Sequence, residues 1–134
     1  IKVGDNVYYS FPAAEKLAQL TVEDLAPLHA GYRAEYIIIA AKAVADGSLD
    51  LEALKAMDYK CAIKELRKLR GIGEKVANCA VLFGLSHMEA FPVDVWMKRA
   101  LKENFPEDFD PVSLGAYAGL AQQYIFYYAR SMGK

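Results

Sequence analysis

The fold of this chain is decided by the stretch Leu69-Arg70-Gly71-Ile72-Gly73-Glu74-Lys75-Val76-Ala77-Asn78-Cys79. Two glycines at a turn that enters a helix allow backbone N–H groups to approach a phosphate closely. A lysine, Lys75, follows the second glycine by two residues, and a lone acid, Asp94, comes 19 residues later within Phe91-Pro92-Val93-Asp94-Val95. If the chain folds back so that the acid lies near the lysine, the lysine amine can act as a nucleophile. The pattern points to chemistry on a nucleic acid.

Composition sets the broad class of the protein. The 134 residues are 54% hydrophobic and 25% charged, which favours a globular domain with a core over a disordered chain. The apolar runs, such as residues 36–41, are too short to span a bilayer, and no signal or transit sequence is visible. Cys61 and Cys79 form neither a disulfide framework nor a metal quartet, so we expect a reducing, intracellular location.

The distribution of charge is more informative than its total. The net charge is −1, but residues 60–75 carry six basic and two acidic side chains. A second basic cluster consists of Lys98, Arg99 and Lys102. This polarity predicts one basic face suited to phosphates, although a set of solvated helix faces would look the same.

The apolar spacing predicts helices throughout, without convincing strand alternation or internal repeats. We expect Ser10 and the segment Thr21–Asp24 to begin helices and Gly47 and Gly84 to end them. The expected longer helices cover residues 32–46, 51–57, 60–69, 74–83, 94–104 and 113–131. Because residues 1–9 offer no cap and no clear partner element, we interpret the chain as part of a larger protein.

Five segments, in order, resemble the helix-hairpin-helix and Gly/Pro…Asp signature of base-excision DNA glycosylases, and within them the 8-oxoguanine DNA glycosylase/AP lyases. They are Ser10-Phe11-Pro12, Gly31-Tyr32-Arg33-Ala34-Glu35-Tyr36, Gly71 to Cys79, Pro92-Val93-Asp94-Val95 and Ala121-Gln122-Gln123-Tyr124-Ile125-Phe126. The resemblance implies an all-α helical glycosylase domain over residues 1–134, incomplete at its N-terminus, with the hairpin at about 60–84. The family's β-rich N-terminal domain has no counterpart in this sequence, so a missing segment or a second chain is expected to supply it.

The resemblance assigns the chemistry to Lys75 and Asp94. Lys75 would attack the anomeric carbon of the damaged nucleoside, form a Schiff base and permit β-elimination. The alternative is a surface lysine that binds phosphate. The positive end of a helix disfavours a second positive charge in its first turn, where Lys75 lies. Asp94 would stabilise the oxocarbenium-like sugar, and it is also a good N-cap residue.

The resemblance also assigns a base pocket and a DNA surface. Cys79 and Phe126 would enclose the extruded base and Gln122 would bond its Watson–Crick edge, although Phe126 could be plain core. Tyr32 would wedge into the base stack and Arg33 would contact the orphaned cytosine, unless Arg33 pairs with an acid.

Gly71 and Gly73 would grip a phosphate through their amides, in backbone conformations that a side chain would block. A structural cation at the hairpin would bind the carbonyls of Arg67, Leu69 and Ile72, and no other cofactor is required. His29 and His87 have no partners at metal-ligand spacing, and we assign them no role.

Two other functions share these features. Endonuclease III-type glycosylases for oxidised pyrimidines have the hairpin, lysine and acid, but usually four clustered cysteines after the acid, and no cysteine follows Cys79. A non-catalytic helix-hairpin-helix module would need neither Lys75 nor Asp94.

Trp96 and Ala129 stand where many eukaryotic members of the family have a His and an Asp. This joint replacement resembles a bacterial branch of the family, so we expect a cytoplasmic, nucleoid-associated enzyme, or a nuclear one if the source is eukaryotic. The expected partner is damaged double-stranded DNA, with no membrane.

Overall fold

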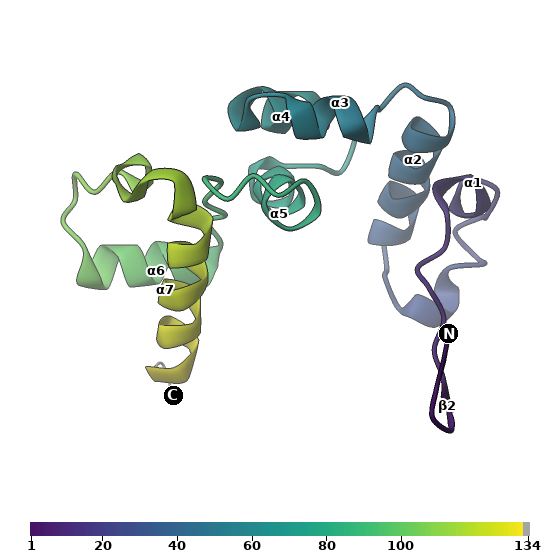
Figure 1. Cartoon of the computed structure of the whole chain (residues 1–134), viewed down its shortest axis with the longest axis horizontal. Helices are drawn as coiled ribbons and strands as arrows, with labels where there is room; N and C mark the ends of the chain where they lie inside the picture. The colour runs from purple at the N-terminus through teal and green to yellow at the C-terminus, as the bar shows by residue number, and fades with distance from the viewer. Residues whose placement is uncertain (133–134) are drawn as a thin grey trace. The chain divides into compact units, whose positions relative to one another are not determined.

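A turn joins two helices at the glycine stretch, as the sequence predicts. In this computed structural model, which describes residues 1–132, the turn lies between α4 (Tyr59–Leu66) and α5 (Glu74–Gly84) (Figure 1). Gly71 has φ +93°, a left-handed conformation that favours glycine. Gly73 has φ −87° and ψ 179°, and a Cβ built there would meet open space. The expected conformational need for glycine is therefore confirmed at Gly71 and wrong at Gly73.

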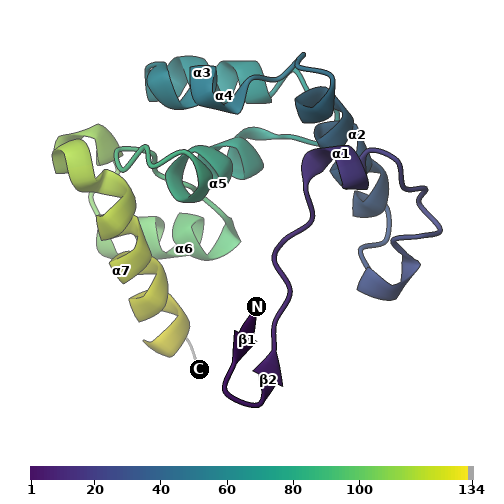
Figure 2. The same cartoon turned by 45° about the vertical axis from the view of Figure 1, so that its right-hand side comes forward.

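The chain divides between Asp50 and Leu51 into two compact units, each with its own core. The first unit begins with a small antiparallel hairpin of β1 (Lys2–Val3) and β2 (Asn6–Val7), in which Lys2 faces Val7 (Figure 2). The sequence reading missed this hairpin, because two-residue strands are too short to show alternation. The rest of the unit consists of α1 (Ala14–Leu17), the 3₁₀ turn η1 (Ala26–Leu28) and α2 (Arg33–Ala45).

Two of the helix starts predicted in the first unit need correction. Helix α1 begins at Ala14 and not after Ser10, because Ala13 before it is still extended at ψ 153°. Thr21 and Asp24 do form the reciprocal hydrogen bonds of a capping box: each backbone N–H donates to the other side chain, at 2.8 and 3.3 Å. Only a 3₁₀ turn follows them, and Pro27 within it has no N–H to donate to an α-helical ladder.

The second unit is helical and carries every residue assigned to the chemistry. In addition to α4 and α5 it contains α3 (Leu51–Ala56), α6 (Val95–Asn104), the 3₁₀ segment η2 (Pro111–Tyr117) and α7 (Ala118–Met132). The prediction of one helix from residue 113 was wrong over residues 113–117. Gly115 interrupts the helical conformation there with φ +70° and ψ −153°.

Helix α7 packs unusually closely where it begins. Its second residue, Gly119, donates its backbone N–H to the carbonyl oxygen of Met88 at 2.7 Å. A Cβ on Gly119 would lie 2.6 Å from the carbonyl oxygen of Ala90 and 2.4 Å from a methyl carbon of Leu82. Only a glycine therefore fits here, and this contact fixes the start of α7 against the segment that follows α5.

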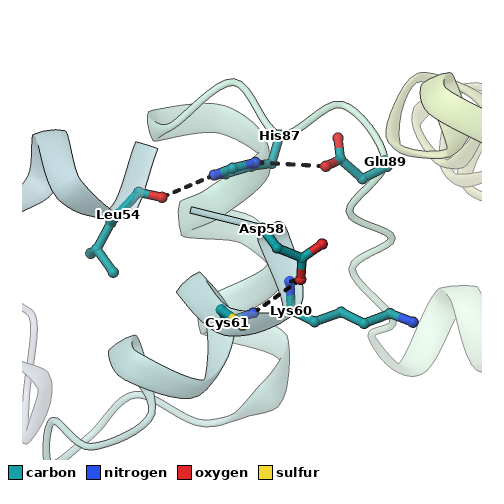
Figure 3. A network of polar contacts seen from close by, with 6 residues as sticks. All are labelled: Leu54, Asp58, Lys60, Cys61, His87 and Glu89. Carbon is teal, nitrogen blue, oxygen red and sulfur yellow. Dashed lines mark hydrogen bonds and ion pairs between the residues drawn. The ribbon is translucent and has the colours of Figure 1, made fainter. Parts of the chain in front are cut away.

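His87, to which the sequence assigned no role, connects two parts of the second unit (Figure 3). Its side chain is buried, and its Nε2 lies 3.2 Å from the carbonyl oxygen of Leu54 at the end of α3. A carbonyl can only accept, so Nε2 carries a proton and donates it. The Nδ1 atom lies 3.7 Å from the carboxylate of Glu89. His87 thus ties α3 to the loop that leads from α5 toward Asp94.

Candidate active site

A pocket of about 190 Å³ in the second unit brings together all five side chains predicted to act on the base and sugar. Its lining comes from α5, the start of α6 and the middle of α7, which are far apart in the sequence. The lining residues are Lys75, Cys79, Phe83, Pro92, Asp94, Gln122, Gln123 and Phe126. The predicted convergence of the lysine and the acid on one site is therefore seen in the structure.

Helix α5 presents one face to this pocket. Lys75, Cys79 and Phe83 follow one another at intervals of four residues, so they lie in a row along the helix. Lys75 is exposed in the first turn, whereas Cys79 is half-buried. Lys75 forms no ion pair with any residue from 1 to 132. The amine is therefore not neutralised by a protein carboxylate and is accessible at the rim of the pocket.

Asp94 is held rigidly at the N-terminus of α6. Its Oδ1 accepts the backbone N–H of Met97 at 2.9 Å, which confirms the predicted N-cap. Met97 is fully buried, so the turn that holds the carboxylate is anchored in the core. One carboxylate oxygen is thus engaged in the cap, while the Asp94 side chain also lines the pocket.

Helix α7 supplies an amide pair and an aromatic ring. Gln122 is only 4% exposed, and its Oε1 accepts a short hydrogen bond from the side-chain amide of Gln123. The Gln122 amide nitrogen is a donor, and its oxygen has a second lone pair, so the side chain can hydrogen-bond the edge of a bound base. Phe126 lines the pocket and also packs against the core cluster of Phe91, Met97 and Ala118.

Arg130, one turn beyond Phe126, connects two aromatic rings beside the pocket. Its guanidinium carbon lies 5.3 Å from the ring centroid of Trp96 and 6.0 Å from that of Phe126. Both distances fall within the range of cation–π attraction. Trp96 follows Asp94 by two residues, so this contact joins the start of α6 to the aromatic wall of the pocket.

Tyr32 and Arg33 lie in the first unit, at the start of α2. Tyr32 is 68% exposed, and its ring meets that of Tyr36 edge to face with centroids 5.8 Å apart. The Arg33 guanidinium lies 4.7 Å from the Tyr32 ring centroid. The two side chains predicted to contact DNA therefore form one exposed stack.

The hairpin closes through contacts between its own ends. The Leu69 carbonyl accepts the Ile72 N–H at 3.1 Å, and Arg67 forms a 2.5 Å ion pair with Glu74 across the turn. Among residues 1–132 no group of three or more His, Cys, Asp and Glu side chains could hold a metal ion. A cation at this hairpin would therefore depend on the backbone carbonyls of Arg67, Leu69 and Ile72.

Several pocket residues were not predicted from the sequence. The sequence contains a signal for Phe83, because this residue continues the four-residue spacing from Lys75 and Cys79. Gln123 had a weaker one, as the neighbour of Gln122. The sequence contains no signal for the contact of Arg130 with Trp96, because the two residues lie 34 positions apart.

No helix within residues 1–132 combines the length and apolarity needed to cross a membrane.

Sequence comparisons find relatives of this chain among DNA glycosylases. A probable N-glycosylase/DNA lyase of Methanothermobacter thermautotrophicus is 35% identical over 125 residues, which cover 87% of this chain and 40% of that protein. A DNA-3-methyladenine glycosylase of Bacillus subtilis is 42% identical over 88 residues, 65% of this chain and 29% of that protein.

The fold of this chain is similar to that of a solved DNA glycosylase structure. The 8-oxoguanine glycosylase/lyase of Clostridium acetobutylicum, in complex with double-stranded DNA containing cytosine opposite 8-oxoguanine, superposes with a TM-score of 0.86 at 34% identity. The match covers 100% of this chain and 49% of that one, so the chain spans less than half the length of these three proteins. Residues 2–111 match the family described as "HhH-GPD superfamily base excision DNA repair protein". The chain belongs to the HhH-GPD superfamily of base excision DNA repair proteins.

Proposed function

We propose that the protein excises 8-oxoguanine from duplex DNA and then cleaves the strand, as a bifunctional glycosylase/AP lyase. The observation that carries this proposal is the single pocket that contains Lys75, Asp94, Cys79, Gln122 and Phe126. Its volume of about 190 Å³ is below the roughly 300–1,000 Å³ of pockets for drug-sized ligands, and it suits a single base. In this proposal residues 1–134 act as the helical domain of such an enzyme.

Lys75 is the nucleophile. Its neutral amine attacks C1′ of the damaged nucleoside, the N–C1′ bond forms, and the glycosidic bond breaks with its electron pair leaving on the base. The Asp94 carboxylate stabilises the positive charge that develops on the sugar, and its cap to Met97 keeps it in place. Opening of the sugar gives a Schiff base, loss of a C2′ proton follows, and the C3′–O3′ bond breaks by β-elimination.

Cys79 and Phe126 enclose the base, and the Gln122 amide donates to its edge. Tyr32 and Arg33 contact the DNA at the vacated position and the opposite cytosine. The amides near Gly71 and Gly73 hold a phosphate, and a cation bound by the carbonyls of Arg67, Leu69 and Ile72 would add positive charge there. The partner is therefore damaged double-stranded DNA.

Borohydride trapping tests the proposal directly. We expect the intact protein to form a covalent adduct with duplex containing 8-oxoguanine, and Lys75→Gln to abolish it. Lys55→Gln, which removes an exposed lysine outside the pocket and both basic clusters, serves as the matched control and should trap normally. Parallel duplexes contain thymine glycol, 3-methyladenine or no lesion. Preferred trapping on thymine glycol would favour the oxidised-pyrimidine alternative, and the absence of both an adduct and a released base on every duplex would indicate a non-catalytic DNA-binding module.

A further inference from the structure

A second, wider cavity in the same unit shares Lys75 with the active-site pocket. It is a groove of about 870 Å³ between α4, the first turn of α5, the segment 89–93 and the start of η2. Its floor contains apolar and aromatic side chains, among them Ile63 and Phe91, which are buried. Because Lys75 lines both cavities, the groove reaches the place where the sugar would react.

Cations dominate the rim of the groove. Lys60, Lys64 and Lys98 line it on exposed side chains, and none of them forms an ion pair within the part of the chain that the structure describes. Lys60 and Lys64 are four residues apart and so lie on one face of α4. Figure 3 shows the Lys60 side chain extending away from the Asp58 cap.

The carboxylates in the groove are engaged by the protein itself. Glu74 pairs with Arg67 at 2.5 Å, and Glu89 faces the His87 ring at 3.7 Å (Figure 3). Asp110 accepts the backbone N–H of Val112 at 2.9 Å. The positive potential of the three lysines is therefore only partly offset, and an unpaired cationic rim next to a reacting sugar fits a phosphodiester chain.

We propose that this groove binds the lesion-containing DNA strand beyond the extruded nucleotide, with Lys60, Lys64 and Lys98 contacting successive phosphates. The inference rests on the proposed function, because a DNA strand presented to Lys75 would run along the groove that Lys75 also lines. It adds a binding surface to the hairpin and the base pocket. These contacts carry no base information, so they contribute affinity for damaged and undamaged duplex alike.

Salt dependence of DNA binding tests the groove. In the intact protein we compare K60Q/K64Q/K98Q with K16Q/K42Q/K55Q, which removes three exposed lysines that lie outside the groove and outside both basic clusters. Affinity for a short undamaged duplex is measured over a range of salt concentrations. For the groove variant we expect the slope of log K against log salt to become shallower by about 2.7, since each lost phosphate contact removes ~0.9. The control should keep its slope, and K60R/K64R/K98R should retain the parental slope because it keeps the charges.

The outcomes separate this inference from the proposed function. Equal changes of the salt slope in both glutamine variants would show that overall charge, and not the groove, causes the effect. An unchanged slope in the groove variant would overturn the proposal and leave the groove to another partner, such as an acidic peptide. Thermal melting shows whether each variant is folded, and the arginine variant supports the conclusion if the glutamine variant is not. Trapping at Lys75 by the parental protein is scored independently, so its failure would be seen as a failure of the proposed function.

Discussion

Asp94 accepts the backbone N–H of Met97 at 2.9 Å, so the carboxylate proposed to act on the sugar is also the N-cap of α6. The two roles can be separated, because asparagine caps a helix about as well as aspartate but carries no charge. We expect Asp94→Asn to change the free energy of unfolding by less than about 0.5 kcal/mol, whereas Asp94→Ala should lose about 1 kcal/mol.

Asp94→Asn should nevertheless lose most of its turnover on duplex containing 8-oxoguanine while it still binds that duplex. Denaturant unfolding, gel-shift binding and single-turnover excision measure the three properties. Normal turnover by the asparagine variant would leave Asp94 with a structural role alone.

Gly119 should tolerate no side chain. A Cβ there would lie 2.6 Å from the Ala90 carbonyl oxygen, and overpacking of this kind typically costs about 1–3 kcal/mol. We expect Gly119→Ala to lower the melting temperature and, by displacing α7, to weaken base excision as well. Gly84→Ala is the control, since a Cβ on Gly84 meets nothing within 4 Å. Equal stability of the two variants would contradict the close packing described for α7.

Arg130 should affect catalysis more than stability. An exposed cation–π contact contributes about 0.5–1 kcal/mol, so losing the contacts to Trp96 and Phe126 corresponds to roughly a two- to fivefold change. We expect Arg130→Ala to slow base excision by about this factor in single-turnover assays, with a melting temperature close to that of the parent. Arg99→Ala removes an arginine that, within residues 1–132, forms its ion pair with Glu103, and it should excise the base at the parental rate. A similar loss in both variants would argue against a specific role for Arg130.

The pKa of Asp24 should depend on Thr21. The backbone N–H of Thr21, and then its hydroxyl, donate to the Asp24 carboxylate and lower its pKa below the ordinary value. A depressed pKa stabilises the folded state above the pKa of the unfolded chain, about 3.9, and this contribution is lost as the pH falls through the folded value.

We expect Thr21→Val to raise the pKa of Asp24 only partway, because the backbone donor remains. Carbon-detected NMR titration of the carboxylates measures this. The carboxylate of Asp46, whose pKa is lowered by Ser48, provides an internal control that should not move. No change at Asp24 would show that the hydroxyl contributes nothing.

The sequence was most informative where structure is set locally. The start of α6 at Asp94 and the turn at Gly71 were predicted because an N-cap and a left-handed glycine act on their immediate neighbours. Residues 113–117 were mispredicted because apolar spacing continues through Gly115 although its backbone leaves the helix. The grouping of Lys75 with Gln122 came from family resemblance, since no local signal brings residues 47 positions apart into one pocket.

The tertiary contacts that hold the elements around the pocket could not be predicted in this way. Arg130 meets Trp96 only after α6 and α7 pack together, and glycine is required at position 119 by the backbone oxygens of Met88 and Ala90 and the side chain of Leu82. His87 looks like an isolated histidine in the sequence, and its bond to Leu54 depends on the path of the chain between α3 and α5. Each of these contacts depends on tertiary packing and produces no periodic pattern in the sequence.

The boundary between Asp50 and Leu51 has a consequence for substitutions. Under the proposed function, the residues that sense the undamaged strand, Tyr32 and Arg33, belong to one unit, and every group that handles the lesion belongs to the other. Under that proposal, substitutions in the first unit would change tolerance for the opposing base and leave every residue of the pocket unchanged.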